Sequence, residues 1–127
     1  MRLMLLSLLT LSLLLVATQA MALESPTVTT PQEGAALGPN YDIMGSMPYK
    51  AFLVLLTDVF TADGTVLRTV PGIRHWTAAD GTFHFRAASP RVSIGERDTV
   101  VGYRIRIFEA TAQGNGPETV ITCGMAQ

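Results

Sequence analysis

Residues 74–85 read RHWTAADGTFHF, and this stretch decides which fold and which chemistry the chain supports. It contains both histidines and the single tryptophan of the 127-residue chain, with Asp80-Gly81 at its centre. Asp-Gly between two alternating runs is a strong hairpin signal, because a type I′ turn needs positive φ at both central positions. The stretch therefore predicts two antiparallel strands, and it forms a site only if the turn brings the histidines together.

The length of the turn decides which side chains share a face of this hairpin. With a two-residue loop, Asp80-Gly81, the two histidines become diagonal neighbours on the polar face. With a three-residue loop that adds Ala79, they lie on opposite faces. We favour the two-residue loop, because a slip of one residue would move Trp76 out of the core. In the favoured register the apolar face of the hairpin consists of Trp76, Ala78, Phe83 and Phe85.

His75 and His84 are candidate metal ligands in the favoured register. A structural zinc site takes four protein ligands and a catalytic zinc site takes three plus water. The polar face adds only Thr77, while Arg86 brings a positive charge that repels a cation. A small metal-binding or hydrolytic protein that uses His75 and His84 is therefore the alternative interpretation. The sequence has no nucleophile elbow, no His-Glu-x-x-His motif and no phosphate-binding glycine loop, so we expect neither an enzyme nor a cofactor.

Residues 1–22 have the layout of a secretory signal peptide. Arg2 precedes an apolar run over residues 3–17, and Ala20-Met21-Ala22 supplies small residues where signal peptidase reads them. The apolar run is shorter than the roughly 20 residues that a membrane-spanning helix needs. We predict cleavage after Ala22, with Ala20 as the alternative site. Residues 23–127 then form one secreted or periplasmic domain without stable membrane insertion.

The mature chain is weakly acidic and contains one cysteine. Removal of Arg2 changes the net charge from −1 to −2, since eight basic and ten acidic residues remain. Because no strong basic field is present, we do not expect nucleic-acid binding. A single cysteine forms no internal disulfide, so the domain depends on packing alone. We interpret Cys123 as a buried strand residue, with an intermolecular disulfide as the alternative.

Short apolar or alternating runs, separated by Gly, Pro, Asp and Asn, indicate an all-β sandwich or barrel. We expect strands at residues 27–30, 41–45, 51–60, 65–70, 73–78, 82–88, 99–111 and 118–125. The tetrapeptide ADGT occurs at residues 62–65 and again at 79–82, each time between two of these runs. Two turns of the same chemistry are therefore expected.

Residues 51–60, AFLVLLTDVF, are apolar on both faces of the predicted strand. Phe52, Val54 and Leu56 share one face, which we assign to the core, and Leu53 and Leu55 share the other. A strand of this kind lies centrally and has something on its second face. Either the loops of the domain cover Leu53 and Leu55, or these two leucines contact a partner or a second copy in a homodimer.

Residues 103–111, YRIRIFEAT, alternate more cleanly. Tyr103, Ile105 and Ile107 point to one face and are expected in the core. Arg104 and Arg106 point to the other face, and the ordinary interpretation of such a pair is a face exposed to solvent. We take Leu53, Leu55, Arg104 and Arg106 together as the candidate interaction surface.

The order of these features resembles bacterial immunoglobulin-like domains, and is similar to the Ig-like domain appended to spore-germination proteins. The likeness covers residues 25–122. Its motifs are a Pro-x-x-Gly entry (Pro31, Gly34), a strand that ends in Gly45, a Gly-x-Phe-x-Phe strand (Gly81, Phe83, Phe85) and a penultimate strand of the Tyr-x-Ile-x-Ile kind. The chain lacks the cysteine pair of antibody domains, and its tryptophan lies beside a turn.

This resemblance implies an immunoglobulin-like Greek-key β-sandwich of about seven or eight strands. It brings no shared catalytic residues, because these motifs are turn and core positions. We therefore expect an exported bacterial module that binds an envelope protein or a surface polysaccharide, by strand addition or through an apolar patch. A purely structural module of a surface assembly is a further alternative.

Overall fold

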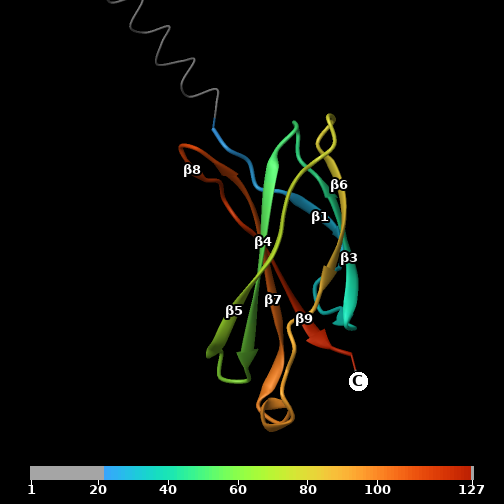
Figure 1. The fold of residues 1–127 in the computed structure, drawn as a ribbon, viewed down its shortest axis with the longest axis vertical. Helices are drawn as coiled ribbons and strands as arrows, with labels where there is room; N and C mark the ends of the chain where they lie inside the picture. Colours follow the sequence, from blue (N-terminus) through green and yellow to red (C-terminus); the bar gives the residue numbers. More distant parts are fainter. Residues whose placement is uncertain (1–21, 127) are drawn as a thin grey trace, which may run out of the picture.

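The computed structural model of the chain describes residues 22–126 (Figure 1). The predicted signal peptide lies outside the described residues, except for Ala22. Within the described range, no helix has the length and apolar character that a bilayer crossing requires. The strands are β1 (Thr27–Thr30), β2 (Ala36–Leu37), β3 (Asn40–Ser46), β4 (Phe52–Thr61), β5 (Val66–Trp76), β6 (Thr82–Ala88), β7 (Val100–Thr111), β8 (Gly114–Asn115) and β9 (Thr119–Met125).

The strands form two sheets, and the predicted immunoglobulin-like β-sandwich is confirmed. The smaller sheet has the order β1-β3-β6, and the larger has the order β2-β9-β7-β4-β5, with β8 paired to the end of β7. The two short strands β2 and β8 were not expected. One 3-10 turn, η1 (Ile94–Glu96), lies in the loop between β6 and β7. Figure 1 shows η1 at the opposite end of the molecule from the turn between β5 and β6.

The core lies between the sheets and is built from the central strands. Its largest fully buried side chains are Ile43 of β3, Leu53 and Val59 of β4, and Ile105 and Ile107 of β7. Burial of an aliphatic side chain of this size contributes about 1.5–3 kcal/mol. Because the described chain has no disulfide, these contacts hold the two sheets together.

The core-facing side of β4 is opposite to the one predicted. Leu53 and Leu55 are 1% and 2% exposed and belong to the core, so they cannot form a contact surface. The alternation of β7 decides this orientation, because Leu55 pairs with the inward-facing Ile107 while Val54 pairs with Phe108 on the outer face. The sequence of β4 is apolar on both faces and therefore did not reveal its own orientation.

Two predicted strands, 65–70 and 73–78, form the single strand β5. The break was expected at Pro71-Gly72, but β5 is an edge strand, where proline costs no ladder hydrogen bond on its free side. A register shift between Val54 and Leu56 absorbs the extra residue as a bulge. A Cβ at Gly72 would lie 2.7 Å from Cδ2 of Leu55, so glycine permits this close approach.

Both ADGT copies fold into the same three-residue loop, and the predicted two-residue loop is wrong. Gly64 and Gly81 have φ of 87° and 91°, while no other residue type in the described chain has positive φ. A type I′ turn would need positive φ at the aspartate as well. Each aspartate instead accepts a hydrogen bond from the backbone N–H two residues later, at 3.0 Å in both copies. This local bond fixes the loop.

The two loops lead to different connections. The first joins β4 to β5 as a hairpin within the larger sheet. After the second, β6 pairs with β3, so the chain crosses from the larger sheet to the smaller one. Only Ala78 and Thr82 pair across the second loop, where the N–H of Ala78 donates to the carbonyl of Thr82 at 2.9 Å. The stretch 74–85 is therefore a bridge between sheets and not a two-stranded hairpin.

A candidate binding surface around Trp76

The crossing places the two histidines on different sheets, although both line one hollow of the surface. His75 lies on β5 of the larger sheet, with its ring 5.7 Å from that of Phe85. His84 lies on β6 of the smaller sheet, where its Nε2 is 3.2 Å from Oδ1 of Asp42. In residues 22–126 no group of three or more His, Cys, Asp or Glu side chains is placed to hold a metal ion. The metal-binding alternative stays a prediction that rests on two residues from different sheets.

Trp76 was predicted in the core, but it is 54% exposed. The physical reason is its place on β5, which has a neighbour, β4, on one side only. Its Cα partner is Phe52, which lies on the outer face of β4. Trp76 therefore lies on the outside of the larger sheet, at its edge, where the fold does not require an indole ring.

Two aromatic and two cationic side chains alternate around this position. The rings of Trp76 and Phe52 meet edge to face, with centroids 5.5 Å apart and planes at 65°. Nζ of Lys50 lies 5.5 Å from the centroid of Trp76, and the guanidinium carbon of Arg74 lies 5.9 Å from that of Phe52. The pairing of Phe52 with Trp76 and the period of two along β5 place Arg74 on the same face. Lys50 lies in the segment before β4, and its contact with the ring of Trp76 adds it to this group. We call these four residues the Trp76 surface.

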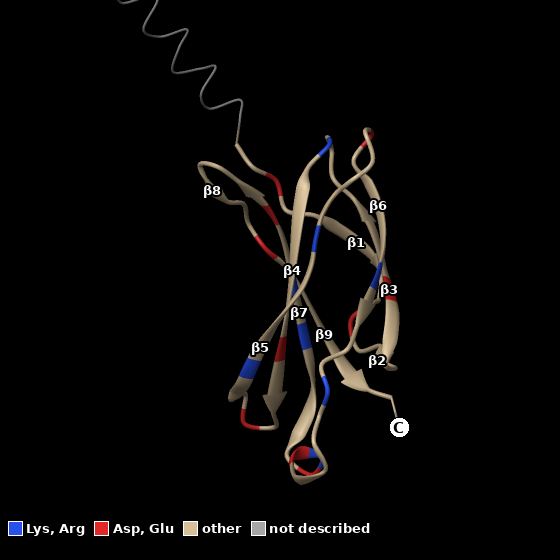
Figure 2. Cartoon of the chain, viewed as in Figure 1, with Lys and Arg blue, Asp and Glu red and all other residues tan. Residues whose placement is uncertain are grey.

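The positive charges of the Trp76 surface are not paired with carboxylates. Elsewhere Arg68, Arg86 and Arg106 each lie within 4.0 Å of an acidic oxygen. In the part of the chain that the structure describes, neither Lys50 nor Arg74 has such a partner within that distance. Each lies over an aromatic ring instead, and both side chains are exposed. Figure 2 shows acidic and basic positions interspersed over both sheets, so this local group does not belong to a wider basic field.

The backbone around the Trp76 surface is held by reciprocal hydrogen bonds. The N–H of Thr77 donates to the carbonyl of Ala51 at 2.8 Å, and the N–H of Ala51 donates to Oγ1 of Thr77 at 3.0 Å. Thr77 is buried, so these bonds are shielded from water. They join the residue after Trp76 to the residue after Lys50, and thereby fix the separation of the two side chains.

A second contact supports the loop before β4. The hydroxyl of Tyr49 donates to Oε1 of the buried Glu109 at 2.6 Å. Desolvation by burial, and then the hydrogen bond to Glu109, raise the pKa of Tyr49 above its ordinary value. The carboxylate of Glu109 is thus occupied within the fold. Tyr49 precedes Lys50, so this bond also helps to hold the backbone at Lys50.

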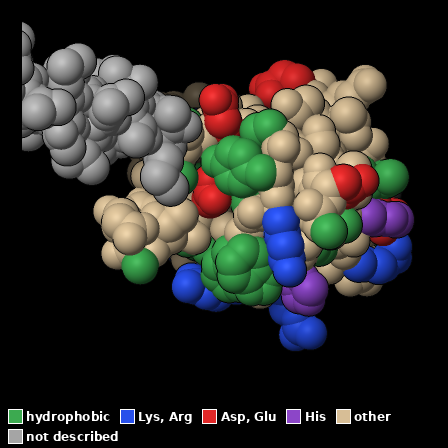
Figure 3. Space-filling view, turned by 90° about the horizontal axis from the view of Figure 1, so that it is seen from above, with side chains coloured by type: hydrophobic (Ala, Val, Ile, Leu, Met, Phe, Trp, Pro, Cys, Tyr) green, Lys and Arg blue, Asp and Glu red, His purple; other side chains and the backbone are tan. Residues whose placement is uncertain are grey.

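Trp76 lies between two hollows of the surface and lines both of them. The larger, of about 930 Å³, opens between β5 and β6 and includes Ile73, His75, Phe83 and Phe85. The smaller, of about 540 Å³, includes Phe52, Arg74 and residues 109–112. Figure 3 shows this end of the molecule, where hydrophobic side chains lie against Lys, Arg and His side chains. A ligand bound on Trp76 can therefore contact both the flat indole ring and the hollows beside it.

Arg104 and Arg106 lie on the outer face of the larger sheet, as predicted, but both are engaged within the fold. Arg106 donates to the two carboxylate oxygens of Asp58 at 2.9 and 3.0 Å, and Arg104 lies over the ring of Phe60 at 5.3 Å. Burial alone would raise the pKa of Asp58, but the hydrogen bonds from Arg106 and Thr69 lower it below its ordinary value. A role for the two arginines in binding stays a prediction.

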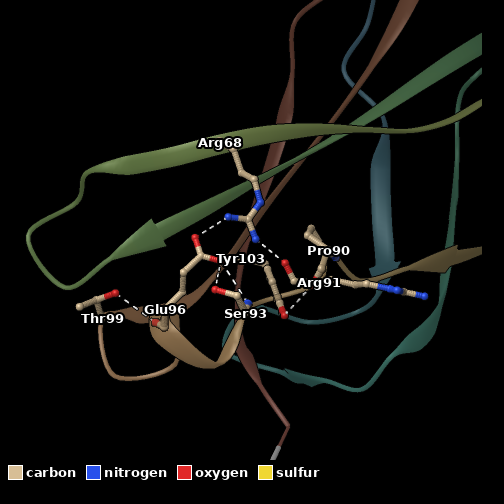
Figure 4. Close-up of polar contacts among 7 residues, drawn as sticks. All are labelled: Arg68, Pro90, Arg91, Ser93, Glu96, Thr99 and Tyr103. Atoms are coloured by element: carbon tan, nitrogen blue, oxygen red, sulfur yellow. Dashed lines mark hydrogen bonds and ion pairs between the residues drawn. The ribbon is translucent and has the colours of Figure 1, made fainter.

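A second exposed apolar feature lies at the opposite end, in the loop around η1 (Figure 4). The guanidinium of Arg68 donates to Oε2 of Glu96 at 2.7 Å and also to the carbonyl of Arg91. The side chain of Glu96 accepts hydrogen bonds from Ser93, which completes a capping box. This network holds the tip of the loop, where Ile94 is 83% exposed.

No protein-family model matches the chain, and a search of curated proteins finds no match. Solved structures align over part of the fold. A structure of Bacteroides uniformis β-glucuronidase 2 covalently bound to cyclophellitol-6-carboxylate aziridine aligns with a TM-score of 0.40 and 18% identity. Another structure of Bacteroides uniformis β-glucuronidase aligns with a TM-score of 0.39 and 18% identity. The chain spans 13% of the length of these enzymes, and 79% of its own length is covered.

Proposed function

We propose that this protein is an exported bacterial binding module of the immunoglobulin-like kind, which takes a cell-surface polysaccharide onto the Trp76 surface without catalysis. Export rests on the signal-peptide pattern of residues 1–22. The observation that carries the binding role is the exposed ring of Trp76, which stands between two hollows and is not needed by the core. An apolar ring of this size in a rigid position is typical of a contact site.

Sugar rings suit this geometry better than a flat protein surface does. A pyranose presents a face of C–H groups that packs on an indole, while its hydroxyls reach polar groups at the edge of the ring. The Trp76 surface offers two cationic donors near the indole, Lys50 over the ring of Trp76 and Arg74 over the neighbouring ring of Phe52. The reciprocal bonds of Thr77 with Ala51 order these groups before a ligand arrives, which lowers the entropy cost of binding.

Retardation of the protein in gels cast with different bacterial surface polysaccharides tests this proposal. At least one polymer is expected to retard the protein, and Trp76→Ala is expected to abolish the retardation. Ile94→Ala is the matched control, because it removes an exposed apolar side chain from the opposite end. Equal retardation of the protein and of Trp76→Ala by every polymer would contradict the proposal.

A second candidate function is the binding of an envelope protein by strand addition. In the described chain β5 pairs only with β4, and β6 pairs only with β3, so each strand has one free edge. An extended segment of a partner can add to such an edge. Amide exchange on an immobilised envelope extract separates the two candidates, since strand addition protects amides of β5 or β6 even in Trp76→Ala. Sedimentation of the purified protein and of Trp76→Ala shows whether the predicted homodimer forms.

A further inference from the structure

We propose that the ligand of the Trp76 surface is an anionic polysaccharide, whose sugar ring stacks on Trp76 while its acidic group pairs with Lys50 and Arg74. This inference rests on the proposed function and assigns the chemical class of its ligand.

The cations of the Trp76 surface differ from the cations in ion pairs in what they do for the fold. Arg68 holds the loop around η1, and Arg106 neutralises the buried Asp58. Lys50 and Arg74 hold no element in place, and their side chains are exposed beside the aromatic rings. An ion pair at an exposed position contributes little to folding. Arg91, Arg97 and Arg104 also have no carboxylate within 4.0 Å in the described chain. What sets Lys50 and Arg74 apart is that two such cations lie together beside the exposed ring of Trp76.

The two cations lie over the two neighbouring rings of one surface, where they can pair with an acidic group of a ligand. Both lie between 5 and 6 Å from an aromatic centroid, Lys50 from Trp76 and Arg74 from Phe52. The planar guanidinium of Arg74 matches a carboxylate or a sulfate in two-point contact, and the ammonium of Lys50 serves as a point charge. A neutral sugar would leave both charges without a partner.

The rest of the molecule does not attract polyanions. The full chain has a formal charge of −1, and acidic and basic residues are interspersed over both sheets (Figure 2). Charges separated by more than about 10 Å are screened at ordinary ionic strength. Recognition of an anionic polymer must therefore occur through contacts at the Trp76 surface, and not through a general field.

The test compares polygalacturonate with the same polymer after its carboxyl groups are reduced to alcohols. The two polymers share a backbone, so the difference in affinity measures the role of the anion. We expect polygalacturonate to bind roughly tenfold more tightly than the reduced polymer. The double variant Lys50→Gln/Arg74→Gln is expected to lose this preference but to keep weak binding of both polymers. Trp76→Ala is expected to lose both.

Arg97→Gln is the matched control, because it removes an exposed arginine from the loop that carries η1. It is expected to bind polygalacturonate like the unmodified protein.

Dextran sulfate identifies the kind of anion. Binding of dextran sulfate alone assigns a sulfate in place of a carboxylate and supports the same pairing with Lys50 and Arg74. Measurable and equal affinity for the two galacturonate polymers overturns the inference and leaves the proposed function standing. If Arg97→Gln loses as much affinity for polygalacturonate as the double variant does, the inference is also overturned, because such a result indicates unspecific ion exchange. If no polymer binds in either test, the inference and the proposed function are overturned together.

Discussion

Trp76 meets Phe52 edge to face across β4 and β5, with ring centroids 5.5 Å apart. The pair follows from the register, because the two residues are Cα partners on the outer face of the sheet. An aromatic contact of this geometry contributes about 0.5–1.5 kcal/mol beyond simple burial. Phe52 therefore holds the indole ring in one orientation before any ligand binds.

Replacement of Phe52 by alanine is expected to release the indole ring without unfolding the protein. The free energy of unfolding should fall by more than the ~1 kcal/mol of the ring contact, because the burial of the half-buried Phe52 is lost as well. The fluorescence anisotropy of the single tryptophan should fall as well, since the ring gains local motion. Val120→Ala, another exposed apolar residue of the same sheet, should leave the anisotropy unchanged. An unchanged anisotropy in Phe52→Ala would show that other contacts orient Trp76.

The two ADGT loops offer a matched pair of glycine variants. Gly64 and Gly81 have nearly the same φ, so alanine at either position is strained by roughly 1–2 kcal/mol. A Cβ at Gly64 meets nothing within 4 Å, whereas a Cβ at Gly81 would lie 2.0 Å from the carbonyl oxygen of Met47. We expect Gly81→Ala to be clearly less stable than Gly64→Ala in urea denaturation. Equal midpoints for the two variants would contradict this packing.

Stability is expected to fall in acid. The pKa of Asp63 is lowered to about 2, first by the hydrogen bond from the hydroxyl of Thr61, and hydrogen bonds from Thr82 likewise lower the pKa of Asp80. A carboxyl group whose pKa is lower in the folded state contributes stability that is present above its unfolded pKa, near 3.8 here. This contribution is lost as the pH falls from about 4 to about 2. Urea midpoints measured across this range should decline, and Asp63→Asn should decline less steeply. A midpoint that stays constant would refute the assignment.

Cys123 is expected to be unreactive in the folded protein. Burial raises the pKa of its thiol to about 11, with a smaller contribution from the charge of Glu33. The thiolate is the reactive form, so a thiol reagent near neutral pH should modify Cys123 only as fast as the domain unfolds. Because this pKa is raised above its ordinary value of 9.0, the associated stability is present below pH 9 and is lost as the pH rises towards 11. Rapid modification in the native state would favour the intermolecular disulfide instead.

The strands that the sequence predicted best are those with a clear alternation. Residues 27–30 and 82–88 match β1 and β6 in full, and the two faces of β7 were assigned correctly. In these segments, polar and apolar residues alternate along the sequence, and this alternation indicates which side chains face the core and which face solvent. The orientation of β4 was missed because both of its faces are apolar, and only the pairing with β7 distinguishes them.

The candidate site was harder to predict, because it depends on partners that are distant in the sequence. The histidine pair was inferred from a local turn, and the loop that separates the histidines depends on a hydrogen bond to the side chain of Asp80. The exposure of Trp76 depends on the place of β5 at the edge of the sheet. Lys50 and Arg74 each stand two residues before an aromatic ring, and this spacing was a visible signal. It becomes meaningful only once Phe52 and Trp76 are known to be paired.

The emission of Trp76 during titration with polygalacturonate tests whether an anionic polymer contacts this ring, because no other tryptophan contributes to the signal. We predict a saturable change in the intensity and wavelength of emission, which is absent with the carboxyl-reduced polymer at the same concentration. The Lys50→Gln/Arg74→Gln variant should require a roughly tenfold higher polymer concentration for the same change. An emission spectrum that does not change while the polymer is bound would contradict the account, because it would place the ligand away from Trp76.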